Sequence, residues 1–227
     1  MRIDNWGLVH GTPVEEWIGS FGLLVKREDL CSPLPGPPFS KMRGVMAHIR
    51  SRPEPIIGVL DTYHSQAGWA VAHACATFGK QCINFYPEYK AEPGHRLSQT
   101  SAKGLGALLV PLPAGRSAIL YHRARRWLRE NYYSSKYYMM PNALKLNESV
   151  AETALEASQT SWPPGRVVVV VPSSSATILS GVVKGLSLLN RSWRYPPTVV
   201  CHLGYSRSEK SVRQYIGKMV STPEFDY

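Results

Sequence analysis

Three short polar segments place reactive side chains at the start of helix-like stretches. Ser40–Arg43 offers the amine of Lys41, and His64–Gln66 offers a hydroxyl and a carboxamide. Pro172–Thr177 offers three serines and a threonine. A lysine at the positive end of a helix is disfavoured as a cation, which favours the neutral amine that attacks carbonyl carbons. Hydroxyls and backbone N–H groups at a helix start bind phosphate.

Each segment alone also has an ordinary structural interpretation. The serines can cap a helix, His64 can hydrogen-bond within its loop, and Lys41 can be a surface side chain. In this chain order, however, the three segments meet the needs of pyridoxal phosphate (PLP). A lysine amine forms a Schiff base with the cofactor, a carboxamide hydrogen-bonds the ring oxygen, and a helix start holds the phosphate.

The segments that carry these side chains alternate between strand-like and helix-like patterns. The predicted strands are residues 23–26, 56–60, 81–87, 107–113, 167–171 and 198–203. The predicted helices are residues 41–50, 66–78, 90–103, 117–131, 147–159 and 177–189. This alternation predicts an α/β fold with mainly parallel sheets flanked by helices, and the valine run at 167–171 is expected to be a central strand. Ligands bind at the carboxyl ends of such strands, where all three polar segments lie.

Four stretches resemble the fold-type II PLP-dependent enzymes. They are TPVEEW, LLVKREDLCSPLPGPPFSKMRGV, HSQAGWAVAHACATFGKQC and VVVVVPSSSATILSGVVKGL. The branch they resemble most is that of aminocyclopropane-carboxylate deaminase and D-cysteine desulfhydrase. With weaker matches between them, the resemblance spans nearly the whole chain.

The resemblance assigns a role to each polar segment. It implies that Lys41 forms the Schiff base, and that Ser65 orients the substrate carboxylate or assists proton transfer. It also implies that Gln66 contacts the cofactor ring. The residues that would bind the cofactor phosphate are Ser173, Ser174, Ser175, Ala176 and Thr177. A larger cofactor-binding domain is expected from residues 1–45 and 143–227, and a smaller α/β domain from residues 46–142.

The sequence departs from the family pattern in three ways. Serines and an alanine stand where the phosphate loop has glycines, and Gln66 stands where the family has asparagine. The family usually continues for many tens of residues beyond PEFDY, and that part supplies the partner of the cofactor's pyridine nitrogen. We therefore expect a shortened, reduced fold-type II scaffold.

The charge of the chain suggests a further partner. The net charge is +10 and the isoelectric point is near 9.6, and a cationic surface attracts polyanions such as nucleic acid. Residues 116–138 interleave basic and aromatic side chains, and the nucleic-acid candidates are Arg123, Arg126, Arg129 and Lys136. The alternatives are a solvated helix face with Trp127 in the core, or a bias that serves solubility or an anionic substrate.

Two functions follow from these observations. The main hypothesis is a PLP-dependent deamination, elimination or decarboxylation of an amino acid, or of an amino-acid-like group attached to a nucleotide or DNA base. The alternative is a non-catalytic nucleic-acid-binding protein on a degenerate PLP-enzyme scaffold. The resemblance also implies a homodimer.

Other residues give expectations of absence or of ordinary structure. Cys31, Cys75, Cys82 and Cys201 lack CxxC spacing, which predicts free thiols and no metal site. No apolar run is long enough to span a membrane and no signal segment is evident, so a cytoplasmic protein is expected. Glu28 and Asp29 could suggest acid–base chemistry, but they are expected to form salt bridges within the segment KRED. Glu152 and Glu156 are expected on the surface.

Overall fold

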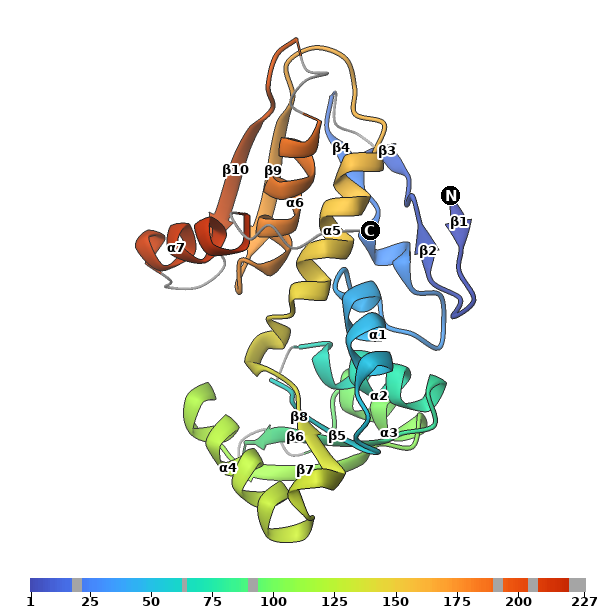
Figure 1. The fold of residues 1–227 in the computed structure, drawn as a ribbon, viewed down its shortest axis with the longest axis vertical. Coiled ribbons are helices and arrows are strands. Elements are labelled where there is room, and N and C mark those ends of the chain that lie inside the picture. Colours follow the sequence, from blue (N-terminus) through green and yellow to red (C-terminus); the bar gives the residue numbers. More distant parts are fainter. Residues whose placement is uncertain (18–21, 63–64, 90–93, 190–193, 204–207, 221–227) are drawn as a thin grey trace.

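The protein consists of two groups of helices and strands stacked along its long axis, with α1 (Met42–Ser51) and α5 (Asn147–Gln159) running between them (Figure 1). The computed structural model describes residues 1–17, 22–62, 65–89, 94–189, 194–203 and 208–220. Within these ranges, none of the helices combines the length and apolar character needed to cross a membrane. The thiols of all four cysteines are free, as predicted.

One group is built on a four-stranded parallel sheet with the order β7-β6-β5-β8. The strands are β5 (Ile56–Leu60), β6 (Gln81–Glu88), β7 (Leu108–Pro113) and β8 (Tyr137–Met139). Two helices, α2 (Ala67–Thr77) and α3 (Leu97–Gly104), cover one face, and α4 (Ser117–Asn131) covers the other. Helices on both faces of a parallel sheet confirm the predicted α/β class.

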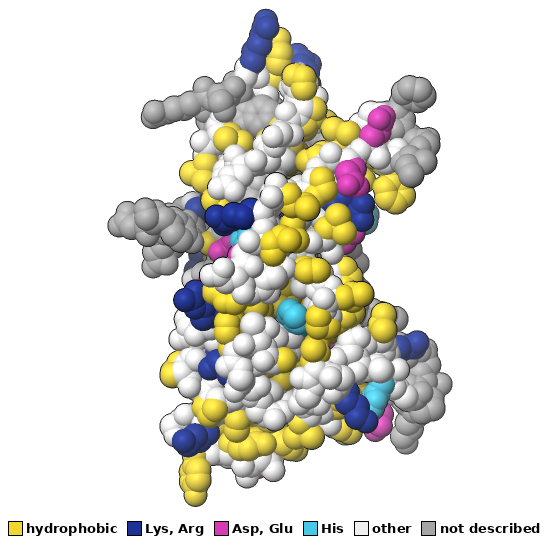
Figure 2. Space-filling view, turned by 90° about the vertical axis from the view of Figure 1, so that its right-hand side faces the viewer, with side chains coloured by type: hydrophobic (Ala, Val, Ile, Leu, Met, Phe, Trp, Pro, Cys, Tyr) yellow, Lys and Arg dark blue, Asp and Glu magenta, His cyan; other side chains and the backbone are white. Residues whose placement is uncertain are grey.

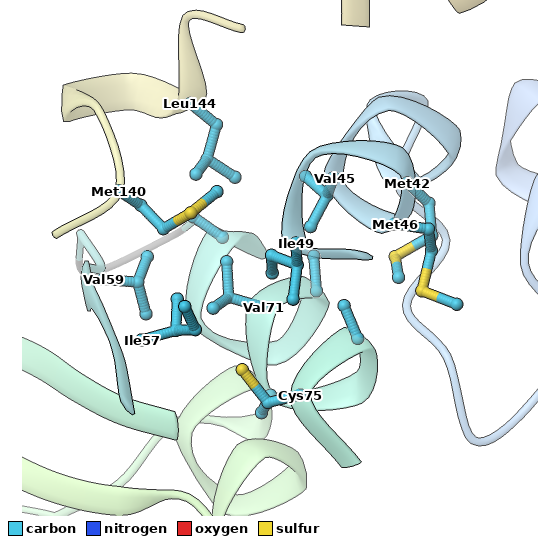
Figure 3. Close-up of a cluster of buried hydrophobic side chains, with 14 of the residues drawn as sticks. Met42, Val45, Met46, Ile49, Ile57, Val59, Val71, Cys75, Met140 and Leu144 are labelled. Atoms are coloured by element: carbon cyan, nitrogen blue, oxygen red, sulfur yellow. The ribbon is translucent and has the colours of Figure 1, made fainter. Parts of the chain in front are cut away.

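The largest apolar core lies between α1, α2 and the β5 side of this sheet (Figure 3). Met42, Val45, Met46 and Ile49 form one stripe of α1 because they are spaced three and four residues apart, and all four are fully buried. The stripe faces Ile57 and other core residues of β5 and α2. Packing along its whole length fixes the direction of α1, whose N-cap is Lys41.

The second group contains β9 (Val168–Ser173), which pairs in parallel with β10 (Thr198–Leu203), together with α5, α6 (Thr177–Leu188) and α7 (Glu209–Val220). Helices α5 and α6 approach closely because Gly181 and Gly185 lie between them. A Cβ at Gly181 would come within 2.4 Å of the Cβ of Thr153, and one at Gly185 within 2.4 Å of the carbonyl oxygen of Ala154. Side chains at these positions would push the helices apart.

Short elements complete the chain. Two antiparallel pairs, β1 (Arg2–Ile3) with β2 (Val9–His10) and β3 (Val14–Glu16) with β4 (Leu24–Lys26), lie beside the second group. The 3-10 helices are η1 (Glu28–Cys31), η2 (Ser134–Lys136) and η3 (Asn142–Leu144).

Two sequence predictions about these elements were wrong. The valine run was expected to be a central strand, but among the described residues β9 pairs only with β10, and Val168 and Val170 are about 60% exposed. One face of this two-stranded sheet is therefore open. The helix predicted at 90–103 begins only at Leu97, because Arg96 has extended backbone geometry and its N–H is capped by Gln99; residues 90–93 lie outside the described ranges.

Candidate active site

A cavity of about 740 Å³ brings the three polar segments together at the carboxyl ends of β5 and β9. Lys41, Ser65 and Gln66 line it, and so does the whole loop Ser173–Thr177 that joins β9 to α6. The fold brings distant parts of the chain together here: Lys41 and Ser175, which are hydrogen-bonded to each other, are 134 residues apart in the sequence. His64, the first residue of the second segment, lies outside the described residues.

Lys41 is buried at the start of α1, with 8% of its surface exposed. Its Nζ atom donates to the carbonyl oxygens of Ala143 at 2.6 Å and Leu144 at 3.3 Å, and to Oγ of Ser175 at 2.9 Å. All three acceptors are neutral oxygen atoms. These contacts hold the amine at the cavity, in position to bond a carbonyl carbon bound there.

The two carbonyl groups that hold Lys41 come from a backbone segment in an unusual conformation. Ala143 and Leu144 in η3 have φ values of 59° and 47°, in the left-handed region that side chains with a Cβ rarely adopt. Such residues cost of order 1–3 kcal/mol each and tend to occur at functional sites. Here the turn directs two successive carbonyls at the lysine amine.

The loop between β9 and α6 forms a cradle of hydroxyl and N–H groups. Ser173 Oγ accepts from the N–H of Ala176 at 3.1 Å, and the hydroxyls of Ser175 and Thr177 lie 3.0 Å apart. Ala176 has a φ of 63°, the geometry that glycine would adopt more easily. The first turn of α6 leaves N–H groups without helical partners, and the helix dipole favours an anion there. The donors of this loop are therefore suited to a phosphate.

Ser65 and Gln66 stand at the start of α2 on another wall of the cavity. Ser65 Oγ accepts from the N–H of Ala67 at 3.0 Å and so caps the helix. The Oε1 atom of Gln66 is buried and has no hydrogen-bond partner among the described residues. A buried polar atom without a partner costs about 1–3 kcal/mol, so this carboxamide is suited to a polar ligand in the cavity.

A buried carboxyl group that the sequence analysis missed lies behind this wall. Asp61 is fully buried after β5, and it accepts hydrogen bonds from Gln99 Nε2 and from the N–H of Thr62, both at 2.9 Å. Burial raises the pKa of Asp61 to about 6, although these hydrogen bonds oppose the shift. The signal for Asp61 was its place directly after the apolar run 56–60 and three residues before the second polar segment.

A cluster of buried charges holds the start of α1 from the other side. Arg43, 3% exposed, donates to Glu28 at 2.7 Å and to the carbonyl oxygen of Val9. Glu156 accepts from Lys26 at 3.0 Å, and its Oε1 lies 3.5 Å from Arg43. These bonds tie α1, α5 and the segment after β4 together two residues from Lys41.

The charge cluster tests two predictions about acidic residues. Asp29 pairs with Arg27, and Glu28 lies 3.6 Å from Lys26, which confirms the salt bridges predicted within KRED. Glu28 also pairs with Arg43. The surface position predicted for Glu156 was wrong, because it is 4% exposed and faces two cations, and Glu152 is half-buried beside it. Spacing on a helix gave no sign that a partner of Glu156, Lys26, lies 130 positions away along the chain.

The cavity fits PLP in the chemistry of its donors. It offers a buried amine, a carboxamide without a partner and a hydroxyl-rich loop at a helix start, each on a different wall. Comparison with known proteins agrees. The sequence pattern of the family described as "Pyridoxal-phosphate dependent enzyme" matches residues 7–219.

The chain belongs to the pyridoxal-phosphate dependent enzyme family. Its cofactor is pyridoxal phosphate. A protein of Pseudomonas phage M6 named glycyl-dTMP PLP-dependent decarboxylase is 52% identical over 216 residues, which cover 93% of this chain and 76% of the relative.

Solved structures share the fold of this family. A homologue of ACC deaminase has a TM-score of 0.67 at 19% identity, over 87% of this chain and 59% of that one. A hydrogen sulfide-producing enzyme from Fusobacterium nucleatum has a TM-score of 0.64 at 16% identity, over 84% of this chain and 63% of that one. The chain thus spans about three fifths of the length of these proteins. The match confirms the fold-type II scaffold predicted from the sequence.

The residues predicted to bind nucleic acid lie outside the cavity. Arg123, Arg126 and Arg129 lie on the exposed side of α4, and Lys136 is exposed in η2; none of them lines the cavity. Trp127 packs edge-on against Phe85 with ring centroids 5.4 Å apart, so this side chain belongs to the core.

Proposed function

We propose that this protein is a PLP-dependent decarboxylase that acts on an amino-acid group carried by a nucleotide, as part of DNA modification. Two observations support the proposal. The phage M6 relative, 52% identical, is named for such a reaction, and Lys41 lies buried in a cavity that fits the cofactor. The matched region covers 93% of the chain and includes every wall of the cavity.

The residues of the cavity divide the work. Lys41 is the attachment point of the cofactor, and its Nζ atom holds or delivers a proton at the α-carbon of the substrate. Ser173–Thr177 hold the phosphate, and Gln66 holds the ring oxygen through its carboxamide. Ser65 orients the substrate carboxylate. When bound, PLP withdraws electrons from the bonds at the substrate α-carbon.

The size of the cavity suits a substrate larger than a free amino acid. Small-molecule sites have volumes of about 300–1,000 Å³, and about 740 Å³ lies in the upper part of that range. The cavity can therefore take the cofactor and still admit an amino-acid group with the base that carries it. Assembly as a homodimer and a cytoplasmic location are further parts of the proposal, and sedimentation of the loaded protein measures the first.

The first test is attachment of the cofactor to Lys41. Purified protein is titrated with PLP while the visible absorption is recorded, and borohydride reduction followed by peptide mapping locates the labelled lysine. Lys41→Ala should lose the band and the label. Lys103→Ala, which removes an exposed lysine of α3, should retain both.

The second test is the reaction itself. A glycyl-modified thymidine nucleotide, free or within DNA, is incubated with the loaded protein, and loss of carbon dioxide is followed by mass spectrometry. Loss that requires Lys41 would support the decarboxylase. Cofactor attachment without loss of carbon dioxide from either substrate would overturn this reaction, and absence of attachment would favour a non-catalytic nucleic-acid-binding protein.

A further inference from the structure

Helix α4 carries a stripe of basic side chains on its outward side. Its apolar residues, including Leu120, Ala124 and Leu128, face the sheet and are buried. The residues His122, Arg125, Arg126 and Arg129 follow one another at intervals of three, one and three, which places them together on the opposite side. All four are exposed. We call these four residues the α4 stripe.

The arginines of the α4 stripe differ in their partners from four arginines elsewhere in the protein. Arg27, Arg43, Arg52 and Arg213 each pair with a carboxylate. Across the portion of the chain that the structure describes, none of the three stripe arginines forms an ion pair. Their charges are therefore available to an external anion.

Positive charge is also concentrated around this helix. Residues 116–136 contain six arginines and lysines and one acidic residue, which gives +5, half of the net charge of the chain. The face of the molecule that turns away from α4 shows basic side chains scattered among apolar and uncharged ones (Figure 2). A concentration of positive charge on one side attracts a polyanion to that side.

Helix α4 connects the α4 stripe with the cavity. Ser117, the first residue of the helix, lines the cavity and hydrogen-bonds the side chain of Asn142, another lining residue. The helix then runs along the outside of the sheet, away from the cavity (Figure 1). The α4 stripe begins five residues, or about 8 Å of helix, beyond the edge of the cavity.

We propose that the α4 stripe binds the phosphate backbone of DNA and so brings the modified base to the cavity. The inference rests on the proposed function, because a substrate within a polynucleotide is what makes a backbone site useful. From residue 122 to residue 129 the stripe is about 10 Å long, the span of about three phosphates of one strand. Contacts to phosphates position a duplex without reading its sequence. The base must leave the stack to reach a cavity of this kind.

The test compares DNA binding by wild-type protein and two triple variants. R125Q/R126Q/R129Q removes the stripe charges and keeps good helix formers. The matched control R2Q/K103Q/K210Q removes three exposed cations from β1, α3 and α7. Binding of a fluorescent DNA duplex is measured by anisotropy at several salt concentrations, with circular dichroism and the cofactor band as checks of folding.

The proposal predicts a specific loss in the stripe variant. Its affinity at low salt should fall at least 10-fold, and its plot of log K against log salt should be shallower by about 2–3, since each phosphate contact contributes about 0.9. The control should change by less than 3-fold. Equal loss in both variants, or no salt-sensitive DNA binding by the wild type, would overturn the inference. Equally strong, stripe-dependent binding of polyglutamate would also overturn it.

Failure of this inference and failure of the proposed function give different results. Decarboxylation of the free modified nucleotide by the wild type depends on the cavity and not on DNA binding. If that reaction occurs while the stripe variant binds DNA like the control, the inference fails and the proposed function stands. If the reaction is absent with every substrate, the proposed function fails whatever the DNA measurements show.

Discussion

Replacing the buried carboxyl of Asp61 by an amide should change how the stability of the protein depends on pH. Asp61 is fully buried, and burial raises its pKa from 3.8 to about 6. The folded protein therefore binds this proton more tightly than the unfolded chain does. The stability that Asp61 contributes is fully present below about pH 4 and is lost as the pH rises through about 6. Asp61→Asn removes this titration and keeps the shape of the side chain.

The magnitude follows from the shift and from the hydrogen bonds. A shift of about 2 units corresponds to about 3 kcal/mol between the protonated and ionised forms. Asparagine has one acceptor oxygen for the donors around it, which include Gln99 and the N–H of Thr62, so the variant should lose at least one hydrogen bond, or about 1 kcal/mol. Asp61→Asn should therefore be less stable than wild type by about 1 kcal/mol at pH 4 and more stable by about 2 kcal/mol at pH 7.5.

Urea unfolding of the cofactor-free protein at a series of pH values measures this difference, because a bound ligand would add its own stabilisation. Asp29→Asn is the control with the opposite sign. Arg27 lowers the pKa of the exposed Asp29, so its smaller contribution is present at neutral pH and is lost as the pH falls. A stability difference between Asp61→Asn and wild type that stays constant within 1 kcal/mol from pH 4 to 7.5 would refute the reasoning.

Three further substitutions test the site and its supports. Ser175→Ala removes a hydroxyl that contacts both Lys41 and Thr177, and it should weaken PLP binding about 5- to 10-fold in a spectrophotometric titration. The control Ser187→Ala removes an exposed hydroxyl that bonds a carbonyl of its own helix, and it should leave PLP binding unchanged. Gly68→Ala places a Cβ 2.1 Å from Nδ2 of Asn84 and should cost about 1–3 kcal/mol in urea unfolding. Gly217→Ala in α7, with open space around it, should be neutral or stabilise by up to about 1 kcal/mol. Glu156→Gln removes one of the two carboxylates that Arg43 and Lys26 share and leaves Glu28, so it should cost about 1–3 kcal/mol. Glu209→Gln, in an exposed pair with Arg213, should cost less than about 0.5 kcal/mol.

The elements that were predicted correctly are those with strong local patterns. The apolar run 56–60 and the amphipathic stretch 117–131 have the bounds of β5 and α4 in the structure. The predictions that failed concerned relations between distant segments. A valine run can be a central or an open strand, and only its neighbours decide which, because both positions suit β-branched residues. Helix α7 was not among the predicted helices.

In the candidate site, too, the residues with a local sequence pattern were predicted, and those whose role depends on distant segments were not. Lys41, Ser65, Gln66 and the serine loop could be found because each lies in a short motif and the motifs occur in the family order. Asp61 and the carbonyls of Ala143 and Leu144 carry no motif. Their roles arise from burial and from left-handed backbone geometry, which depend on the tertiary structure. The separation into domains at residues 45 and 142 stays a prediction.

Ser175 connects the two halves of the cofactor site in a way that the family motif does not suggest. A glycine at this position would offer the phosphate only its N–H, whereas the serine hydroxyl lies 2.9 Å from Lys41 Nζ and 3.0 Å from Thr177 Oγ1. If Lys41 bonds the cofactor, this contact would be released, and the hydroxyl of Ser175 would be free to donate to the cofactor phosphate. The serine would then serve the amine in the free protein and the phosphate in the loaded protein, a second role that a glycine at this position lacks.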